Sequence, residues 1–390
     1  MSFLSVIARL NSLMKRYKEL MAFPQVIRLG ISAFPARLAY GMIGLGIFFK
    51  TEQETGSVAM AGFAIGLNSL AGAVTAGIRG SVMDHFGQKW PIRILVPMYS
   101  SLILLLNTME TGRSILITSF ILGITAPPIN LSVRPLWKDI VPESYLRTAY
   151  AFDSSMMSST SVIGPVVITA LSLSSRPALG LGTTAALMFI GGVALSLTPA
   201  SRDWIPEKKE KNQQKLWRDR AIRLLMLEGC FIGFGWGVFD VAIPAFATQE
   251  GVQHRVAWIF ATFGIATVVG GLLGGLVSKR LAPLSALRRA YILWLIACIP
   301  VAFTYPDWSM ALAGACIGFL GGALQVFYFE VLEAVRPKGS QTASLGWIWS
   351  IEGSFMALGA AVGGLVSEIF SPRIGLAMLP TMIFCGLIIL

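Results

Sequence analysis

The chain of 390 residues is 55% hydrophobic and only 13% charged, and its mean hydropathy is +0.69. A soluble domain needs a largely polar exterior, so this composition indicates that lipid surrounds most of the chain. The net charge of +11 could suit a nucleic-acid-binding protein, but the basic residues cluster in short segments between apolar runs and form no basic stripe with interleaved aromatic residues, which argues against that class.

Residues 1–24 predict an amphipathic helix ahead of the first apolar run. Apolar residues recur there at three- and four-residue steps, and Arg9, Lys15, Arg16 and Lys18 occupy the remaining face. Such a helix can lie in the headgroup layer of a membrane, so we expect it to bind membrane lipids. A solvated leader is the alternative. No clean apolar stretch with a small-residue cleavage site follows the charges, so we expect no cleavable signal peptide.

Twelve apolar runs follow, each long enough for the roughly 20 residues that cross a bilayer. A polar, lysine-rich segment at 200–220 separates six of them, within 25–199, from the other six, within 221–390. We therefore expect an N-terminal segment, an N-terminal half, a linker and a C-terminal half. The predicted spans are 26–49, 57–80, 91–108, 113–135, 147–173, 178–199, 221–248, 255–278, 289–305, 309–332, 343–368 and 372–390.

The distribution of Lys and Arg predicts the orientation of these spans. When both termini are placed in the cytoplasm, 25 of the 31 basic residues fall in cytoplasmic segments or at the adjoining span ends. This bias is the positive-inside pattern, so we expect a multi-pass protein of the bacterial cytoplasmic membrane with both termini inside. The exceptions are Arg37, which lies within a span, and five residues on the outer side: Lys50, Arg113, Arg176, Arg255 and Arg373.

The two halves show a weak internal repeat. Shifting the chain by 195 residues places Arg28 on Arg223 and Pro142 on Pro337, and each pair lies at equivalent span edges. Parallel repeats of this kind are typical of secondary transporters. The expected fold class is therefore an all-α membrane protein with twelve transmembrane helices in two pseudo-symmetric six-helix halves.

A tight polar turn, Gly80-x-x-x-Asp84-x-x-Gly87-x-Lys89, joins the second and third predicted spans. In this position it resembles the loop signature of the major facilitator superfamily. Because Gly80 has no Cβ, two helices can approach closely there. The resemblance implies two halves that rock around a central site, and a loop that braces them when the cytoplasmic side is shut. A solvated turn, with Lys89 serving only topology, is the alternative.

The resemblance also implies where Asp84 points. We expect its carboxylate to face the start of the eleventh span, near Leu345, because a carboxylate there can meet a helix N-terminus or a cation. Arg134, Arg336 and Lys338 are the possible cationic partners.

The fifth predicted span contains Gly164-Pro165. A proline inside a membrane helix leaves a carbonyl unbonded and predicts a bend, which neighbouring helices can repair. The pair resembles the Gly-Pro motif of the superfamily's drug–proton antiporters, although Thr160 and Ile168 stand where glycines are usual. The resemblance implies a drug-like cargo exchanged for protons.

Ionisable residues inside spans are costly to bury and are candidates for binding or coupling. Arg37, Glu228, Asp240 and Glu352 lie within predicted spans, and Asp153 lies in the inner part of the fifth. We expect Arg37 to pair with Glu228, Asp240 or Glu352 across the central cavity, and such a pair could open when the acid is protonated. An ion pair within one half, or a side chain that reaches the interface, is the alternative.

Aromatic residues also occur in the spans that face the central cavity in this fold. Tyr40 and Trp236 are the candidates for contact with an amphipathic or aromatic cargo. Ordinary helix packing is the alternative for both.

No motif for nucleotide hydrolysis or other catalysis occurs, and His85 and His254 are the only histidines. We therefore expect neither an enzyme nor a bound metal or cofactor, and we expect the proton gradient to supply the work. The predicted function is proton-coupled efflux of a small amphipathic compound by a monomer. Uptake or facilitated transport by the same fold remains an alternative, and so does a non-transporting membrane sensor.

Overall fold

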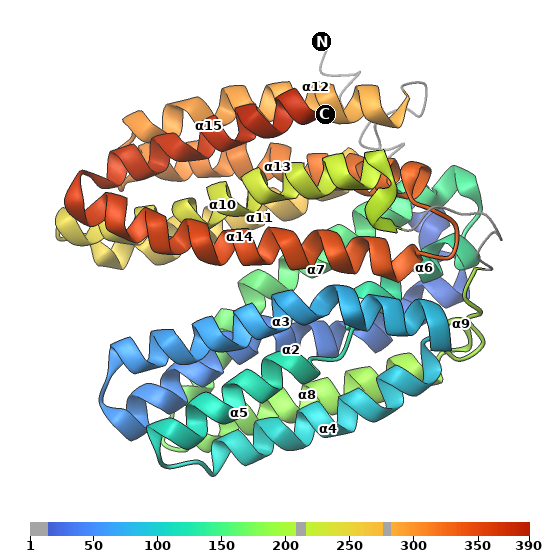
Figure 1. The fold of residues 1–390 in the computed structure, drawn as a ribbon, viewed down its shortest axis with the longest axis horizontal. Coiled ribbons are helices and arrows are strands. Elements are labelled where there is room, and N and C mark those ends of the chain that lie inside the picture. The colour runs from blue at the N-terminus through green and yellow to red at the C-terminus, as the bar shows by residue number, and fades with distance from the viewer. Residues whose placement is uncertain (1–14, 208–215, 276–281) are drawn as a thin grey trace.

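The computed structural model describes residues 15–207, 216–275 and 282–390 (Figure 1). These residues contain helices and no β-strand. Twelve helical segments among them are long and apolar enough to cross a membrane, which confirms the predicted spans and fold class. The predicted boundaries between N-terminal segment, halves and linker stay predictions, and residues 208–215 of that linker lie outside the described residues.

The helices up to the linker are α2 (Pro24–Thr55), α3 (Val58–Phe86), α4 (Lys89–Asn107), α5 (Gly112–Thr125), α6 (Ile129–Ile140), α7 (Glu143–Ser172) and α8 (Ala178–Leu197). The linker contains α9 (Pro199–Arg202) and η1 (Leu216–Arg218). The remaining elements are α10 (Arg220–Gln249), η2 (Gln253–Arg255), α11 (Val256–Gly274), α12 (Pro283–Cys298), η3 (Ile299–Phe303), α13 (Trp308–Val335), α14 (Gln341–Ile369) and α15 (Pro372–Ile389).

Figure 1 shows α2–α8 as one group and α10–α15 as the other. Two pairs of helices carry most of the packing between the groups, α3 with α14 and α7 with α11. The groups also meet where α6 approaches α14 and where α7 approaches α13. We call this region, where α3, α6 and α7 meet α13 and the first turns of α14, the closed end.

The fourth span differs from the continuous helix predicted at 113–135. Pro127 and Pro128 follow Ala126, and the span divides there into α5 and α6. Two consecutive prolines remove two backbone donors, so the helix cannot run through them. The Ala126 and Pro127 carbonyls instead accept hydrogen bonds from the side chains of Arg79 and Tyr40. Side chains of neighbouring helices thus donate hydrogen bonds to the carbonyls at the break, as the interior of a membrane requires.

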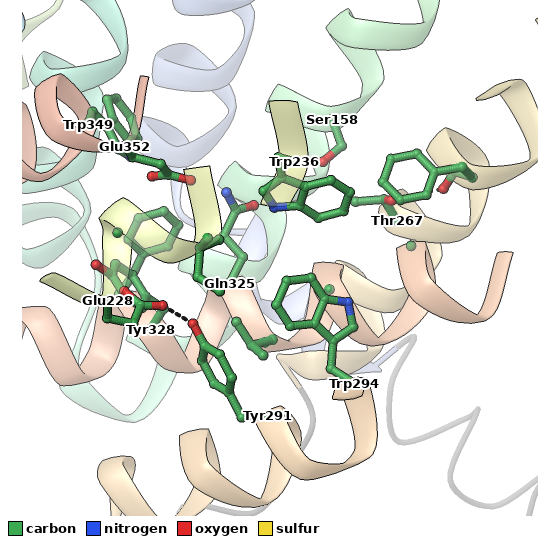
Figure 2. A pocket seen from close by; sticks show the side chains of 17 residues that line it. Ser158, Glu228, Trp236, Thr267, Tyr291, Trp294, Gln325, Tyr328, Trp349 and Glu352 are labelled. Atoms are coloured by element: carbon green, nitrogen blue, oxygen red, sulfur yellow. Dashed lines mark hydrogen bonds between the residues drawn. The ribbon is translucent and has the colours of Figure 1, made fainter. Parts of the chain in front are cut away.

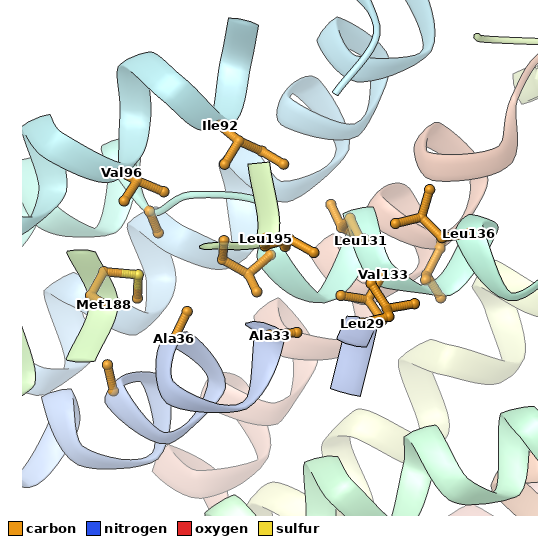
Figure 3. Close-up of a cluster of buried hydrophobic side chains, with 14 of the residues drawn as sticks. Leu29, Ala33, Ala36, Ile92, Val96, Leu131, Val133, Leu136, Met188 and Leu195 are labelled. Carbon is orange, nitrogen blue, oxygen red and sulfur yellow. The ribbon is translucent and has the colours of Figure 1, made fainter. Parts of the chain in front are cut away.

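Buried apolar side chains form two clusters. The larger cluster fills the α2–α8 group, where Figure 3 shows Leu29 of α2, Ile92 of α4, Leu136 of α6 and Leu195 of α8. It continues across the closed end to residues such as Ile348 of α14. The second cluster lies wholly within α10–α15. The apolar packing therefore crosses between the two groups at the closed end.

Gly164 lies where α7 crosses α2. A Cβ at this position would approach the Gly41 backbone carbon to 2.6 Å, so the close contact requires glycine. Pro165 lies inside α7, which continues to Ser172. The close packing of this site is thus observed, while the bend stays a prediction.

The described part of the N-terminal segment packs against the bundle. Residues 15–21 are helical, and Leu20 is buried. Arg16 donates to the Ser144 carbonyl at 2.8 Å, and the Tyr17 hydroxyl donates to the Leu272 carbonyl of α11 at 2.7 Å. The predicted amphipathic helix falls mostly on residues 1–14, outside the described residues, so its lipid binding stays a prediction.

Candidate functional site

Asp84 holds the N-terminus of α14. Its carboxylate accepts bonds from the Thr342 amide at 3.0 Å, the Thr342 hydroxyl at 2.6 Å and the Ala343 amide at 2.7 Å. The first amides of a helix have no intrahelical partner and carry partial positive charge, so a carboxylate satisfies both needs. The structure thus places Asp84 against the start of the eleventh span, as predicted, but its direct partners are backbone groups and a hydroxyl.

Glycines allow α3 and α14 to approach closely at this point. A Cβ at Gly80 would lie 2.5 Å from the Thr342 carbonyl oxygen, and a Cβ at Gly346 would lie 2.7 Å from the Ala76 oxygen. Both obstacles are backbone atoms, which cannot turn aside as a flexible side chain can. The absence of these two methyl groups is therefore what lets Asp84 reach α14.

The rest of the loop shapes the turn. Gly87 has φ of +77°, a conformation that favours glycine, and it ends α3. Gln88 is buried, donates to the Ser132 carbonyl at 2.9 Å and accepts from the Ser201 hydroxyl at 3.1 Å. It thereby ties the loop to α6 and α9. Lys89 begins α4 and lies beside the ring of Trp90.

Two ion pairs join the two groups at the closed end, and a third joins the linker to the second group. Arg147 of α7 holds Glu330 of α13 through two bonds of 2.6 and 2.5 Å. Lys138 of α6 pairs with Glu333 of α13 at 2.7 Å. The third pair, between the linker and α13–α14, is described next. The pairs Arg147–Glu330 and Lys138–Glu333 must open before the two groups can separate at this end.

Glu207 of the linker bridges to the segment between α13 and α14. Its carboxylate accepts from Arg336 at 2.8 and 2.9 Å, from the Gly339 amide at 3.1 Å and from the Gln341 side chain at 2.9 Å. The hydrogen bonds from Arg336 are the main reason that the pKa of Glu207 falls to about 2. The linker therefore fastens the closed end, which the sequence did not indicate.

Arg37 does not reach the acids of the other half. It pairs with Asp153 of α7 at 2.8 Å, and the second oxygen of Asp153 lies 3.1 Å from Arg134. The predicted pairing of Arg37 across the central cavity is therefore wrong, and so is Arg134 as the partner of Asp84. The guanidinium carbon of Arg134 lies 3.2 Å from the ring centre of Phe329. Both arginines belong to a buried cluster within the N-terminal half, the alternative that the sequence had left open.

A cavity of about 250 Å³ lies among the helices of the C-terminal half and holds two carboxyl groups, Glu228 of α10 and Glu352 of α14 (Figure 2). Glu228 is only 2% exposed, and the Tyr291 hydroxyl donates to its carboxylate. Tyr328 lies beside Glu228 on the same wall. Neither acid pairs with Lys or Arg within the described residues. Two acids that the sequence placed in different spans thus share one cavity.

Trp236 forms part of the wall of this cavity, which we call the acidic cavity. Its indole packs against Trp294 and Phe239, with ring centres 5.7 and 5.5 Å apart. Asp240 lies on the same helix but is exposed and does not line the acidic cavity. Of the candidates in α10, the structure therefore brings Glu228 and Trp236 to the cavity and leaves Asp240 outside it.

A second cavity, of about 310 Å³, lies in the N-terminal half and contains Tyr40 and Arg79. Trp349 of α14 lines both this cavity and the acidic cavity, so the two adjoin across the molecule. Arg79 was not among the predicted site residues, because in the sequence it falls among the basic residues at the cytoplasmic span ends. The predicted span ended at residue 80, whereas α3 continues to Phe86, so only the structure places Arg79 well inside the helix.

Comparisons with known proteins agree with this architecture. A family model described as the Major Facilitator Superfamily matches residues 29–330. The chain is 23% identical over 369 residues to an uncharacterized MFS-type transporter, y4rN, of Sinorhizobium fredii, with 90% of each chain covered. It is 24% identical over 362 residues to macrolide efflux protein A of Streptococcus pyogenes, with 86% of each covered. The solved structure of the E. coli fucose:proton symporter FucP is similar in fold, with a TM-score of 0.70 at 14% identity, covering 94% of this chain and 97% of that one.

Proposed function

Because the chain belongs to the major facilitator superfamily, whose members are membrane transporters, we propose that it exports a small amphipathic compound in exchange for protons. The export crosses the bacterial cytoplasmic membrane, with both termini in the cytoplasm. The similarity to macrolide efflux protein A supports export as the direction and a macrolide-like compound as the cargo. The fucose:proton symporter shares only the fold, so it does not bear on direction.

The acidic cavity carries this proposal. A buried carboxylate without a cationic partner is costly, and either a proton or a cationic group of the cargo removes that cost. Glu228 and Glu352 share a cavity whose other walls are mainly aromatic and apolar, with Ser158 of α7, Thr267 and Gln325 adding polar groups. Cargo and proton therefore compete for the same two acids, and competition at one site produces exchange: the carrier releases one ligand when it takes the other.

The closed end acts as the cytoplasmic gate in this proposal. If the basic linker and both chain ends lie on the cytoplasmic side, as we propose, the closed end faces the cytoplasm and the carrier is in an outward-facing state. Before the acidic cavity can open to the cytoplasm, the hydrogen bonds between Asp84 and α14 and the ion pair between Arg147 and Glu330 must break. The bonds at the closed end thus oppose opening until cargo or proton favours the inward-facing state.

Proteoliposomes test the coupling role of the two acids. With radiolabelled erythromycin as the probe, the wild type should accumulate it against its gradient when a pH difference is imposed. Glu352→Gln and Glu228→Gln should each abolish this accumulation and retain exchange of internal for external erythromycin. Glu368→Gln is the matched control, because Glu368 lies on the same helix but is exposed. Unchanged pH-driven accumulation in both cavity variants would refute proton coupling through this site.

Thiol labelling tests the orientation separately. In a cysteine-free variant, an impermeant thiol reagent added to intact cells should label a cysteine at the exposed Glu110 and spare one at the exposed Arg202. The opposite pattern would place the closed end on the outer side of the membrane.

A further inference from the structure

We propose that Arg79 is an anion-binding group of the cargo site, and that the cargo carries a carboxylate in addition to a basic group. This inference rests on the proposed function, because it assigns a second polar contact to the same cargo. It concerns the cavity of the N-terminal half, which we call the basic cavity, and which adjoins the acidic cavity at Trp349.

The guanidinium of Arg79 lies at the break of the fourth span. It donates to the Ala126 carbonyl, to the Gly72 carbonyl at 2.5 Å and to the Thr75 carbonyl at 3.3 Å. A guanidinium has five N–H groups, so two remain for a ligand. The basic cavity, whose wall includes Arg79, is the space into which such a ligand would fit.

No carboxylate pairs with Arg79 within the described residues, and this distinguishes it from three buried arginines of the bundle. Arg37 and Arg134 share Asp153, and Arg147 has Glu330. The neutral carbonyls around Arg79 reduce the cost of burying its charge but do not cancel it. A carboxylate in the basic cavity would cancel the charge and could accept the two remaining N–H groups through its two oxygens.

Further groups in the basic cavity suit a polar ligand. The side-chain oxygen of Asn130 is buried and has no hydrogen-bond partner. An amide can present either its oxygen or its NH₂ group to a ligand. Tyr40 and Tyr99, whose ring centres lie 6.1 Å apart, form an aromatic wall beside these polar groups.

The competing interpretation is a purely structural one. Arg79 bonds the carbonyl that follows the last turn of α5, so it could act only as a C-terminal cap. A helix C-terminus carries roughly half a negative charge, which leaves part of the guanidinium charge uncompensated. Caps need no cavity, whereas Arg79 lines one that adjoins the site for the basic group of the cargo. The opposite charges of the two cavities therefore match a zwitterionic cargo that spans them past Trp349.

Two dyes with the same ring system test the proposal. Rhodamine 110 carries a free carboxylate, and rhodamine 123 is its methyl ester. Fluorescence anisotropy with the purified wild type should show tighter binding of rhodamine 110, by about tenfold or more for one charge-assisted contact. Arg79→Gln should remove this preference and leave the affinity for the ester within about twofold, while Arg79→Lys should keep part of the preference because it keeps the charge.

Arg93→Gln, a change of another arginine in a neighbouring helix, should leave the preference unchanged. Equal affinity of the wild type for the two dyes, or binding of neither, would overturn the proposal. Retention of the preference in Arg79→Gln would do the same. If Arg79→Gln weakens the binding of both dyes equally, Arg79 acts only as a structural cap of α5 and the proposal is wrong. None of these results affects pH-driven erythromycin transport, so failure of this inference is distinguishable from failure of the proposed function.

Discussion

Asp84→Asn should open the closed end. Oδ1 of Asp84 accepts two bonds from Thr342, and Oδ2 accepts the Ala343 amide at 2.7 Å. Asparagine keeps one oxygen and replaces the other with an NH₂ group. If the asparagine oxygen accepts the bonds from Thr342, its NH₂ group faces the Ala343 amide. Both groups are donors, so no hydrogen bond can form between them. The change therefore removes one hydrogen bond and the negative charge at the N-terminus of α14.

Each loss has a known scale. A hydrogen bond to a charged group contributes about 1.5–3 kcal/mol, and a charge at a partly buried helix terminus contributes up to about 2 kcal/mol. We take about 2–3 kcal/mol for the sum, because the asparagine can relax partially. The ratio of open to closed molecules should then rise by roughly 30- to 150-fold, since every 1.4 kcal/mol is a factor of ten.

Spin-label distances measure this ratio. Labels at His85, at the end of α3, and Ala334, near the end of α13, lie on exposed positions of the two groups. The four native cysteines are replaced first. Double electron–electron resonance should show one dominant short distance in the wild type and a larger population at a longer distance in Asp84→Asn, with slower erythromycin exchange in proteoliposomes.

Asp203→Asn is the matched control, because Asp203 is 61% exposed and, within the described residues, forms an ion pair only with its neighbour Arg202. It should match the wild type in both measurements. If Asp84→Asn also matches the wild type in its distance distribution, the bonds to α14 do not hold the closed end, and the argument from helix capping fails.

Three further changes probe the same framework. Gly80→Ala places a Cβ 2.5 Å from the Thr342 oxygen, so erythromycin exchange should fall by about tenfold or more, while Gly66→Ala, with nothing within 4 Å, should leave it unchanged. Asp153→Asn leaves two buried guanidinium groups uncompensated and should destabilise the protein by about 3–5 kcal/mol; an unchanged melting temperature would contradict this structural role. Glu207→Gln should favour the open state modestly, by about 1 kcal/mol for a partly exposed pair. Because the pKa of Glu207 falls from 4.5 to about 2 on folding, its stabilisation is complete above pH 4.5 and is lost as the pH falls towards 2. The difference between wild type and Glu207→Gln in the spin-label ratio should therefore stay constant from pH 8 to about 5, and a steady decline over that range would exclude Glu207 as the source.

The sequence determined the features that depend on local composition. Each span can be recognised from a run of about 20 apolar residues without knowledge of its neighbours. Only a helix or a closed barrel can satisfy all backbone hydrogen bonds inside the bilayer. The loop from Gly80 to Lys89 was also recognisable, because its pattern between the second and third spans resembles the family's loop signature. That resemblance placed Asp84 at the start of the eleventh span, where the structure finds it bound to α14.

Only the tertiary structure decided which groups meet. Successive residues of a helix point about 100° apart, and a helix that is apolar on nearly every side gives little sign of which face meets a neighbour. Arg37 could therefore be placed near mid-membrane, but its partner depended on how α2 and α7 are turned towards each other, and that partner is Asp153. The particular groups that bind Asp84, the amides of Thr342 and Ala343 and the Thr342 hydroxyl, were identified only by the structure. Arg79 is a candidate site residue because α3 packs beside the break of the fourth span, where backbone carbonyls and a cavity surround its guanidinium. This arrangement depends on contacts between distant segments and could not be predicted from the local sequence.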